Sequence, residues 1–389
     1  MVGVLSPALV LTALAGSAAA SPASHLRPDW DVKVVAAGQV VTVNGNPMTV
    51  TQPDDIARLG HDIFVAYQNG VGPQGQPTAA GVDFSTVVEY RLGGTPVAAW
   101  NLTGKVDGLG ADPMASELIA TVNEDANSSL YTIDPHAKPI DQVVHYQYDP
   151  PNPLPHGGGT DAISIYRGQI LISASAPGTT PGAGTAPATM PTVYRATLSR
   201  RPATNTGTAT LTPLFGDGST ATVANTSPPL YSPTSPSPAS YGTVPAPGAH
   251  VALALAYPDS NNVVPPSSPR FAGDFVLDGQ ADQQLVFARG TAQPQLSVLD
   301  LSQSINDSAY ITGRSGTLYV TDPSTDQVLM LRGPLRPGEV IVAATPGSAN
   351  NAVKAPNYLA ALDLFDGTVT AIPGLAGIQP QGLAYVNRG

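Results

Sequence analysis

Acidic residues recur at one place in a repeated pattern along this chain. At that place a polar residue, usually an aspartate, opens a short apolar strand, and a tight turn and a second apolar strand follow. The residues at this position are Asp54, Asp112, Asp161, Asp307 and Gln381. Carboxylate and amide oxygens accept hydrogen bonds and suit hard cations. We therefore expect these five residues to belong to one ligand-binding site.

A polar hairpin turn, "VNEDANSS" (122–129), adds Asn123 and Glu124 to the candidate ligand-binding residues. Glu124, Asp161 and Asp307 form the expected metal-ligand set. Clustered oxygen ligands in a chain without cysteine favour Ca²⁺ over zinc. No motif requires a cofactor, and Ca²⁺ is the one that these side chains would suit.

The candidate catalytic residues are His156 and Asp54. His156 precedes a run of three glycines that leads into Asp161, and a histidine near a carboxylate can act as a general base. The chain contains no GxSxG, HExxH or Walker motif. The catalytic residues therefore stay unassigned beyond these two candidates.

The recurring aspartates have a second interpretation, which is purely structural. Aspartate and asparagine are favoured in turns because their side chains bind nearby backbone groups. Each aspartate could therefore join neighbouring repeats and take no part in ligand binding. The sequence leaves both interpretations open.

Composition excludes several classes of function. The chain has 389 residues and a formal net charge of −11, with no basic stripe, which argues against nucleic-acid binding. Without cysteine it can form no disulfide, thiolate nucleophile or Cys-ligated zinc site. Beyond the first 20 residues no segment has the length and hydropathy of a membrane span.

The elements that must position the acidic residues are all strands. About twenty apolar runs of four to eight residues, such as "DIFVAYQ" and "QILISAS", lie between Gly, Pro, Asn, Asp and Ser residues, and helical periodicity is almost missing. The pattern recurs in units of roughly 45 to 60 residues with about four strands each, which is typical of a β-propeller. We predict an all-β chain with a single propeller of six or seven four-stranded blades over residues 21–389.

Propeller geometry predicts where the acidic residues gather. The start of the innermost strand and the turn between the second and third strands lie at the same face of each blade, so the recurring residues should form a broken ring at the mouth of the central channel. "INDSAYITGRSGTLYVTD" (305–322) is interpreted as the first two strands of one blade. The strand at 30–38 and the strand at 381–386 should pair in one blade and close the ring.

Three segments interrupt the repeat: residues 176–191, the Pro/Ser-rich stretch 226–248, and residues 258–269, "PDSNNVVPPSSP". We interpret all three as insertions. Residues 1–20 end in small residues and are typical of a signal peptide. The expected location is extracellular, either free or associated with the cell wall.

The repeated opening, the "ATVNEDANSSLY" hairpin and the closing "QPQGLAYV" resemble those of exported bacterial β-propellers of the NHL-repeat and SMP-30-like groups. "FVLDGQADQQLVFA" is similar to part of a secreted actinobacterial group of unassigned function. The resemblance spans most of residues 30 to 386. Some members of this wide group are metal-dependent lactonases, so the resemblance implies that activity as an alternative.

Three hypotheses of function follow. The first is a secreted, non-catalytic binding scaffold that holds a small molecule, glycan or protein on the long-loop face of the channel. The second is a divalent-metal-dependent hydrolase, lactonase or lyase of the SMP-30-like type. The third is a structural protein of the cell envelope. In each case we expect a monomer that does not bind nucleic acid or span a membrane.

Overall fold

The computed structural model describes residues 30–43, 45–175, 190–201, 203–230, 245–253, 255, 257–348 and 355–387. Within these ranges the chain forms 28 β-strands and two three-residue 3-10 helices, Pro139–Asp141 and Gln280–Asp282. The prediction of an all-β chain is confirmed. No helix among the described residues is long and apolar enough to span a membrane.

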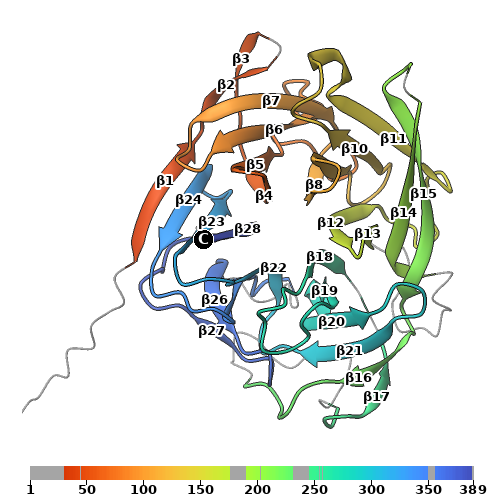
Figure 1. The fold of residues 1–389 in the computed structure, drawn as a ribbon, viewed down its shortest axis with the longest axis vertical. Coiled ribbons are helices and arrows are strands. Elements are labelled where there is room, and N and C mark those ends of the chain that lie inside the picture. The colour runs from red at the N-terminus through yellow and green to blue at the C-terminus, as the bar shows by residue number, and fades with distance from the viewer. Residues whose placement is uncertain are drawn as a thin grey trace, which may run out of the picture.

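Six strands surround a central channel, and three further strands extend outward from each of them (Figure 1). In ring order the inner strands are β4 (Pro53–Leu59), β8 (Val106–Asp112), β12 (Thr160–Tyr166), β18 (Pro258–Val263), β22 (Ile305–Tyr310) and β28 (Leu383–Asn387). Each inner strand contacts the next, and β28 contacts β4, so the ring is closed. This arrangement is a β-propeller of six four-stranded blades.

Consecutive strands build the first three blades. Blade 1 is β4, β5 (Asp62–Tyr67), β6 (Phe84–Arg91) and β7 (Pro96–Thr103). Blade 2 is β8, β9 (Glu117–Val122), β10 (Ser129–Ile133) and β11 (Val143–Asp149). Blade 3 is β12, β13 (Gln169–Ala174), β14 (Pro191–Arg201) and β15 (Thr206–Gly216). All neighbours within these blades are antiparallel.

Blade 4 corrects one prediction about the chain. It comprises β18, β19 (Phe275–Gly279), β20 (Gln284–Arg289) and β21 (Gln295–Asp300). Residues 258–263, expected within an insertion, are its inner strand β18. Proline and asparagine made this strand look like a loop, but Pro258 stands at its first position, where the missing N–H is tolerated.

Blades 5 and 6 exchange strands, which the sequence did not predict. Blade 5 is β22, β25 (Val340–Ala344), β26 (Tyr358–Leu362) and β27 (Val369–Ala371). Blade 6 is β28, β23 (Gly316–Asp322), β24 (Gln327–Arg332) and β1 (Asp31–Ala37). The chain leaves blade 5 after β22, builds β23 and β24 in blade 6, and then returns. The interpretation of 305–322 as two strands of one blade was therefore wrong.

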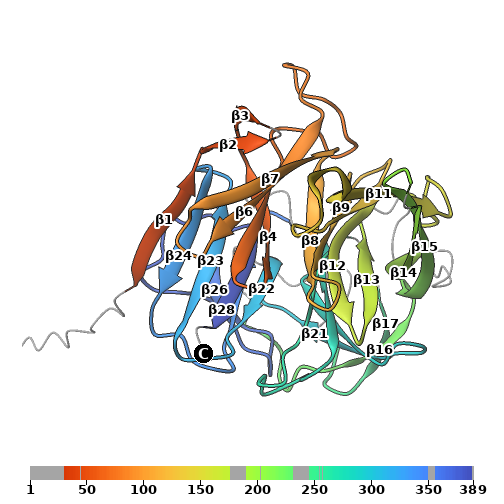
Figure 2. The same ribbon diagram turned by 45° about the horizontal axis from the view of Figure 1, so that its top comes forward.

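The two ends of the described chain meet in blade 6. β28 forms its inner edge and β1 its outer edge, with β23 and β24 between them. The expectation that the two terminal strands share one blade is thus confirmed, although they do not pair directly. Figures 1 and 2 show both strands in this closing sheet.

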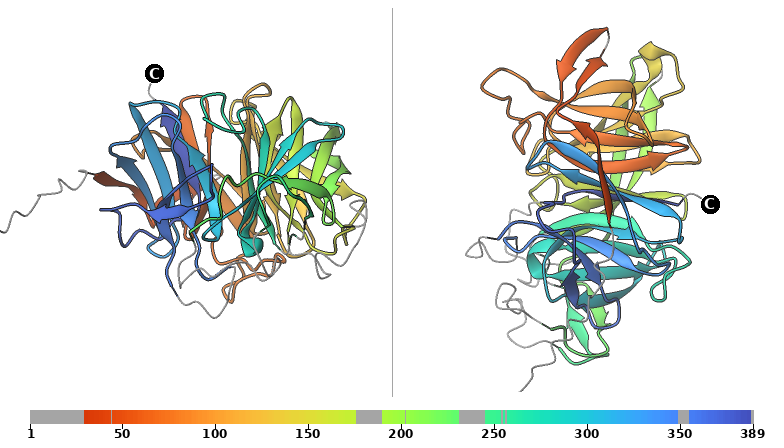
Figure 3. Two further views of the ribbon diagram at one scale, coloured as in Figure 1. Left: turned by 90° about the horizontal axis from the view of Figure 1, so that it is seen from below. Right: turned by 90° about the vertical axis from the view of Figure 1, so that its left-hand side faces the viewer.

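Additional pairing joins the outer edges of neighbouring blades. β11 runs parallel to β15, which connects blades 2 and 3 into one eight-stranded sheet. β16 (Thr220–Val223) runs parallel to β21 and carries β17 (His250–Ala252), which extends blade 4 to six strands. A separate hairpin, β2 (Val40–Val43) with β3 (Asn46–Thr49), follows β1. The edge-on views show the blades standing across the thickness of the disc (Figure 3).

The core lies between adjacent blades. The second strands are largely buried on both faces, and all six residues of β5, "DIFVAY", are buried. Between blades 1 and 2, for example, Phe64 and Trp100 pack with Leu109 and Leu118. Burial of each such side chain contributes about 1.5–3 kcal/mol, so packing between blades holds the inner strands in register.

Several expectations lie outside the described residues. These are the signal peptide at residues 1–20, most of the loop 176–191, and residues 231–244 of the Pro/Ser-rich stretch. They stay predictions, as does the hypothesis of a structural protein of the cell envelope.

Candidate functional site

Each inner strand presents two consecutive residues at the same end of the channel. The first residues are Asp54, Asp107, Asp161, Asp259, Asn306 and Gln381, and the second residues are Asp55, Gly108, Ala162, Ser260, Asp307 and Gly382. In five of the six blades the pairing of the inner strand with its neighbour shifts register at this point. Such bulges re-aim side chains, and here they accompany the polar residues.

The first residues line a cavity of about 430 Å³, which we call the mouth pocket. Gln68, Lys105, Glu124, Tyr257 and Gln280 complete its polar wall. Six of the lining residues carry carboxyl groups and one, Lys105, carries a cation. The mouth pocket is therefore polar and acidic, with contributions from all six inner strands or the residues just before them.

The second residues tie neighbouring inner strands together. The Asp55 carboxylate accepts a hydrogen bond from the backbone N–H of Leu109 on β8 (2.7 Å), and Asp307 accepts one from the N–H of Leu383 on β28 (2.6 Å). Asp307 also accepts from the N–H of Ser308 (2.6 Å). The contacts of Asp307 are therefore those expected from the structural interpretation, in which the recurring aspartates join neighbouring repeats.

Where the second residue is glycine, the next inner strand approaches directly. A Cβ on Gly108 would lie 2.3 Å from the carbonyl oxygen of Asp161, and a Cβ on Gly382 would lie 2.5 Å from that of Asp54. A threonine on the second strand, Thr121 or Thr321, then donates its hydroxyl to the same carbonyl oxygen. Glycine is needed at these two positions because no side chain fits between the strands.

Lys105 neutralises one side of the mouth pocket. Its Nζ lies 2.6 Å from Asp107 Oδ1 and also forms an ion pair with Glu124. Gln68 Nε2 donates to Asp54 Oδ2 (2.7 Å) and to Asp107 Oδ1 (3.1 Å). Burial lowers the pKa of Lys105, but Asp107 and Glu124 outweigh this and hold that pKa above its usual value.

Burial raises the pKa of the first-position aspartates well above the usual range. This applies to Asp54, Asp107, Asp161 and Asp259, and in each case loss of solvation is the largest cause. Neighbouring carboxylates add to the shift at all four positions, while Lys105 opposes it at Asp54 and Asp107. The pocket therefore favours bound protons or a bound cation.

Asp161 and Asp259, on the neighbouring inner strands β12 and β18, form a carboxyl pair. The two carboxyl groups are close enough that Asp259 raises the pKa of Asp161, so the pair favours a shared proton. Both residues are buried. This pair resembles in chemistry the acid–base carboxyl pairs in which two groups share one proton.

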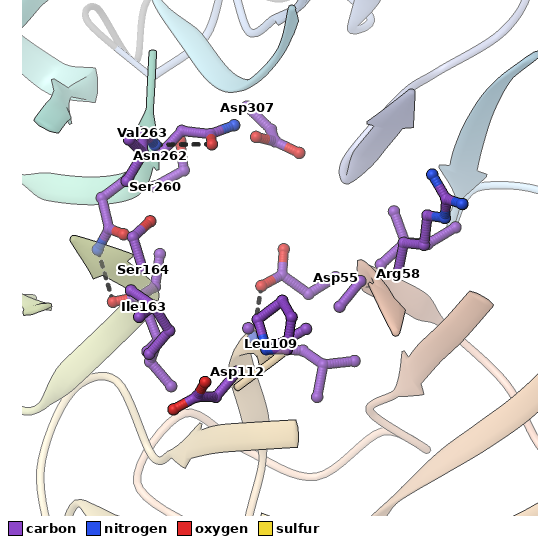
Figure 4. Close-up of a pocket in the computed structure, with 18 of the residues that line it drawn as sticks. Asp55, Arg58, Leu109, Asp112, Ile163, Ser164, Ser260, Asn262, Val263 and Asp307 are labelled. Carbon is purple, nitrogen blue, oxygen red and sulfur yellow. Dashed lines mark hydrogen bonds between the residues drawn. The ribbon is translucent and has the colours of Figure 1, made fainter. Parts of the chain in front are cut away.

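A second cavity of about 440 Å³, the channel pocket, continues along the channel and shares Asp55, Ala162 and Ser260 with the mouth pocket. Figure 4 shows Asp55, Asp112 and Asp307 around it. Asp112 was expected at the start of an inner strand, but it lies at the end of β8 and accepts hydrogen bonds from the N–H groups of Met114 (2.9 Å) and Ala115 (3.2 Å). The predicted position of Asp112 was wrong, because the first residue of this blade is Asp107.

His156 does not reach the mouth pocket. It is 1% exposed, and its two ring nitrogens lie 2.7 Å from the hydroxyl of Tyr194 and 2.7 Å from the carbonyl oxygen of Gly159. Burial lowers its pKa to about 4. The expectation of a histidine on the rim was therefore wrong, and Asp54 alone of the two catalytic candidates lines the pocket.

The predicted hairpin turn places only one of its two candidates in the pocket. Glu124 lines the mouth pocket and accepts a hydrogen bond from the hydroxyl of Tyr257 (3.1 Å). Asn123 is buried and holds the turn, since it accepts from the N–H of Lys105 (3.0 Å) and donates to the carbonyl oxygen of Asn127 (3.0 Å). The turn itself lies at the expected face.

The expected metal-ligand set does not assemble. Glu124 and Asp161 line the mouth pocket, but Asp307 lines the channel pocket. Among the described residues no three His, Asp or Glu side chains are arranged to hold a metal ion. Lys105 already supplies the cation between Asp107 and Glu124. The residues present therefore do not fit the divalent metal that the family resemblance implies.

Asp107, Asp259 and Lys105 are among the mouth-pocket residues that sequence reasoning missed. Asp107 is followed by Gly108 just as Gln381 is followed by Gly382, and this shared pair could have identified it. Asp259 lies in the stretch interpreted as an insertion. Lys105 had no signal of its own, because a single lysine before a strand is typical of an exposed loop.

Comparison with known proteins gives similarity of fold and no assigned family. No family model matches the chain, and no curated protein matches it. A protein of unknown function from Bacteroides caccae has 10% identity and a TM-score of 0.44 over 93% of this chain and 100% of its own. A periplasmic gluconolactonase from Pseudomonas aeruginosa has 12% identity and a TM-score of 0.43, over 88% and 91%. A virginiamycin B lyase from Staphylococcus aureus has 10% identity and a TM-score of 0.41, over 91% and 92%.

These solved structures include lactonase, lyase and unassigned proteins, and all are similar to this chain only at low identity. At such low sequence identities and TM-scores, the function has to be argued from the mouth pocket itself.

Proposed function

We propose that this protein binds a small polar molecule in the mouth pocket. The observation that carries the proposal is the convergence of one polar residue per blade on a single cavity of about 430 Å³. Cavities of roughly 300–1,000 Å³ are typical of small-molecule sites. The leader expected at residues 1–20 would place this binding protein outside the cytoplasm.

The chemistry of the wall supports a polar ligand over an apolar one. Amide and hydroxyl groups of Gln68, Gln280, Asn306, Gln381 and Tyr257 stand between the carboxyl groups. Such groups fix the orientation of hydroxyl- or amine-bearing ligands through hydrogen bonds. An apolar ligand would displace water from the wall without replacing the hydrogen bonds that water makes there, at a cost of about 1–3 kcal/mol for each polar group left unsatisfied.

Thermal shift and calorimetry with a panel of small polar compounds test the proposal. The panel comprises polyols, amino sugars, diamines, small carboxylates and lactones. Ser348→Trp adds bulk to the wall of the mouth pocket, and Met114→Trp adds the same bulk beside the channel pocket. We expect at least one compound to bind, Ser348→Trp to abolish its binding and Met114→Trp to retain it. Binding that responds only to Met114→Trp would refute the assignment to the mouth pocket.

A second candidate function, metal-independent hydrolysis of an ester or lactone, is favoured by the Asp161–Asp259 pair. Two carboxyl groups with one shared proton can supply a general acid and a general base. Asp161→Asn would then remove turnover of a lactone substrate while binding persists, and a chelator would leave turnover unchanged. Turnover that a chelator abolishes would contradict this mechanism.

A further inference from the structure

The wall of the mouth pocket divides into three sectors, and in two of them the polar groups have hydrogen-bond or ion-pair partners within the protein. In the lysine sector, Lys105 and Gln68 supply donors to Asp54, Asp107 and Glu124. In the amide sector, Gln280 and Gln381 both donate to Asn306 Oδ1, at 2.8 and 3.1 Å. Each side chain named in these two sectors therefore already has a donor or acceptor within the protein.

The third sector, Asp161 with Asp259, has no such compensation. Asp161 is 5% and Asp259 8% exposed, and both line the cavity. Within the described ranges, neither carboxyl group accepts a hydrogen bond from an N–H or O–H group of another residue. Two buried carboxyl groups therefore face the cavity with oxygens available to an incoming donor.

A buried carboxyl group behind this sector adds to its negative potential. Asp278 on β19 is 3% exposed, and neither of its oxygens has a hydrogen-bond partner in the described part of the chain. Among charged neighbours, Asp278 raises the pKa of Asp259 most strongly. The acidic sector thus lies in a region that attracts positive charge.

From this asymmetry we propose that the acidic sector binds the primary ammonium group of a small organic cation. The inference rests on the proposed binding function and names the class of ligand. An ammonium group brings three N–H donors and one positive charge, so it can replace the shared proton and donate to both carboxylates. Lys105 does not fill this place, because its Nζ already pairs with Asp107 and Glu124.

The remaining wall of the mouth pocket determines which other chemical groups the ligand can carry. The amide sector and Tyr257 offer neutral hydrogen-bonding groups to hydroxyl or amine substituents. A bare metal ion is a poorer fit, since no three acidic or histidine side chains among the described residues converge on one point. A compact amine such as a diamine or an amino sugar matches both the charge and the volume.

Calorimetry with matched pairs tests the proposal. Putrescine is compared with 1,4-butanediol, and glucosamine with glucose, at pH 7 in two buffers of different ionisation enthalpy. We expect the amine of at least one pair to bind more tightly than its neutral analogue by about tenfold or more, as for a charged hydrogen bond. Binding should also release up to one proton per amine, because the ammonium replaces the proton of the carboxyl pair.

Variants assign the effect to the acidic sector. Asp161→Asn and Asp259→Asn should each weaken amine binding about tenfold to a hundredfold and remove the proton release. Asp112→Asn, at the far end of β8, is the matched control and should change neither. Circular dichroism checks the fold of each variant, and proton release by the unaltered protein tests the proposal even if one variant does not fold.

Other results would overturn the inference. Equal binding of amine and neutral analogue in the mouth pocket would refute the ammonium site but leave the proposed binding function standing. Stoichiometric Ca²⁺ binding that Asp259→Asn abolishes would replace the amine by a metal ion. Absence of binding by every compound in the wider panel would count against both proposals.

Discussion

At the scale of single residues, one sequence position serves two purposes in different blades. The second residue of each inner strand is either an aspartate that reaches the next strand or a small residue that lets the next strand approach. Asp55 and Asp307 are each opposite an alanine of the second strand, Ala66 and Ala343, whereas Gly108 and Gly382 are opposite Thr121 and Thr321. Each of these four blades thus supplies one polar side chain to the junction, from one strand or the other.

Removal of an aspartate tie should destabilise the whole protein. Asp307→Ala leaves the N–H groups of Leu383 and Ser308 without their acceptor. We expect the free energy of unfolding to fall by about 1–3 kcal/mol, with or without Ca²⁺, as measured by urea denaturation. The exposed Asp31→Ala is the control and should stay within about 0.5 kcal/mol. A loss of stability that appears only when Ca²⁺ is present would contradict a purely structural role of Asp307.

The same carboxyl groups predict how stability depends on pH. Burial raises the pKa of Asp55 to about 8 and that of Asp307 to about 7, against about 3.9 in the unfolded chain. Between those values the folded state binds more protons than the unfolded state, so the free energy of unfolding must fall as the pH rises. We expect a lower melting temperature at pH 8 than at pH 5, and a shallower decrease in Asp55→Asn. An unchanged slope in that variant would contradict the raised pKa of Asp55.

The recurrence of acidic residues was visible in the sequence, but their spatial roles were only partly predictable. Asp54, Asp161, Glu124 and Gln381 do meet in one pocket. Asp307 was expected beside Asp54, but its neighbour Asn306 occupies that place. A shift of one residue exchanges the two faces of a strand, and the register shifts at the start of the inner strands cannot be located from apolar patterns alone.

At the scale of elements, strand identity was predictable and strand pairing was not. β22 and β23 are close in sequence and both are apolar, so a hairpin was the natural expectation. In the structure β22 pairs with β25, and β23 pairs with β28 and β24. Both pairings bury similar apolar strands, so alternation of residues cannot distinguish them.

The close approach of inner strands can be tested at Gly108. Gly108→Ala would place a Cβ 2.3 Å from the carbonyl oxygen of Asp161 and 2.5 Å from the hydroxyl of Thr121. The backbone must move to relieve this contact, so we expect a loss of about 1–3 kcal/mol in the free energy of unfolding. Gly93→Ala adds the same methyl group in open space and should be nearly neutral. Equal stability of the two variants would show that β8 and β12 lie further apart.

At the scale of the whole molecule, closure joins three separate segments of the chain in one blade. β1 comes from the start of the described chain, β23 and β24 from residues 316–332, and β28 from its end. Because of the exchange of strands, blade 5 is completed only after the chain has built β23 and β24 in blade 6, and blade 6 is completed only by β28. We therefore infer that these two blades fold as one cooperative unit.

The two terminal strands should differ sharply in their importance for this unit. β28 is an inner strand that contacts both β4 and β22, and its Leu383 and Val386 are buried. β1 is an outer edge strand in which only Val35 and Ala36 are buried. Deletion of residues 380–389 should abolish the cooperative thermal transition, because it removes a wall of the channel and the partner of Asp307. Deletion of residues 30–37 should lower the melting temperature but keep one transition. Calorimetry of the two truncated proteins measures the difference, and a C-terminal truncation that melts like the full chain would show that the ring does not depend on β28.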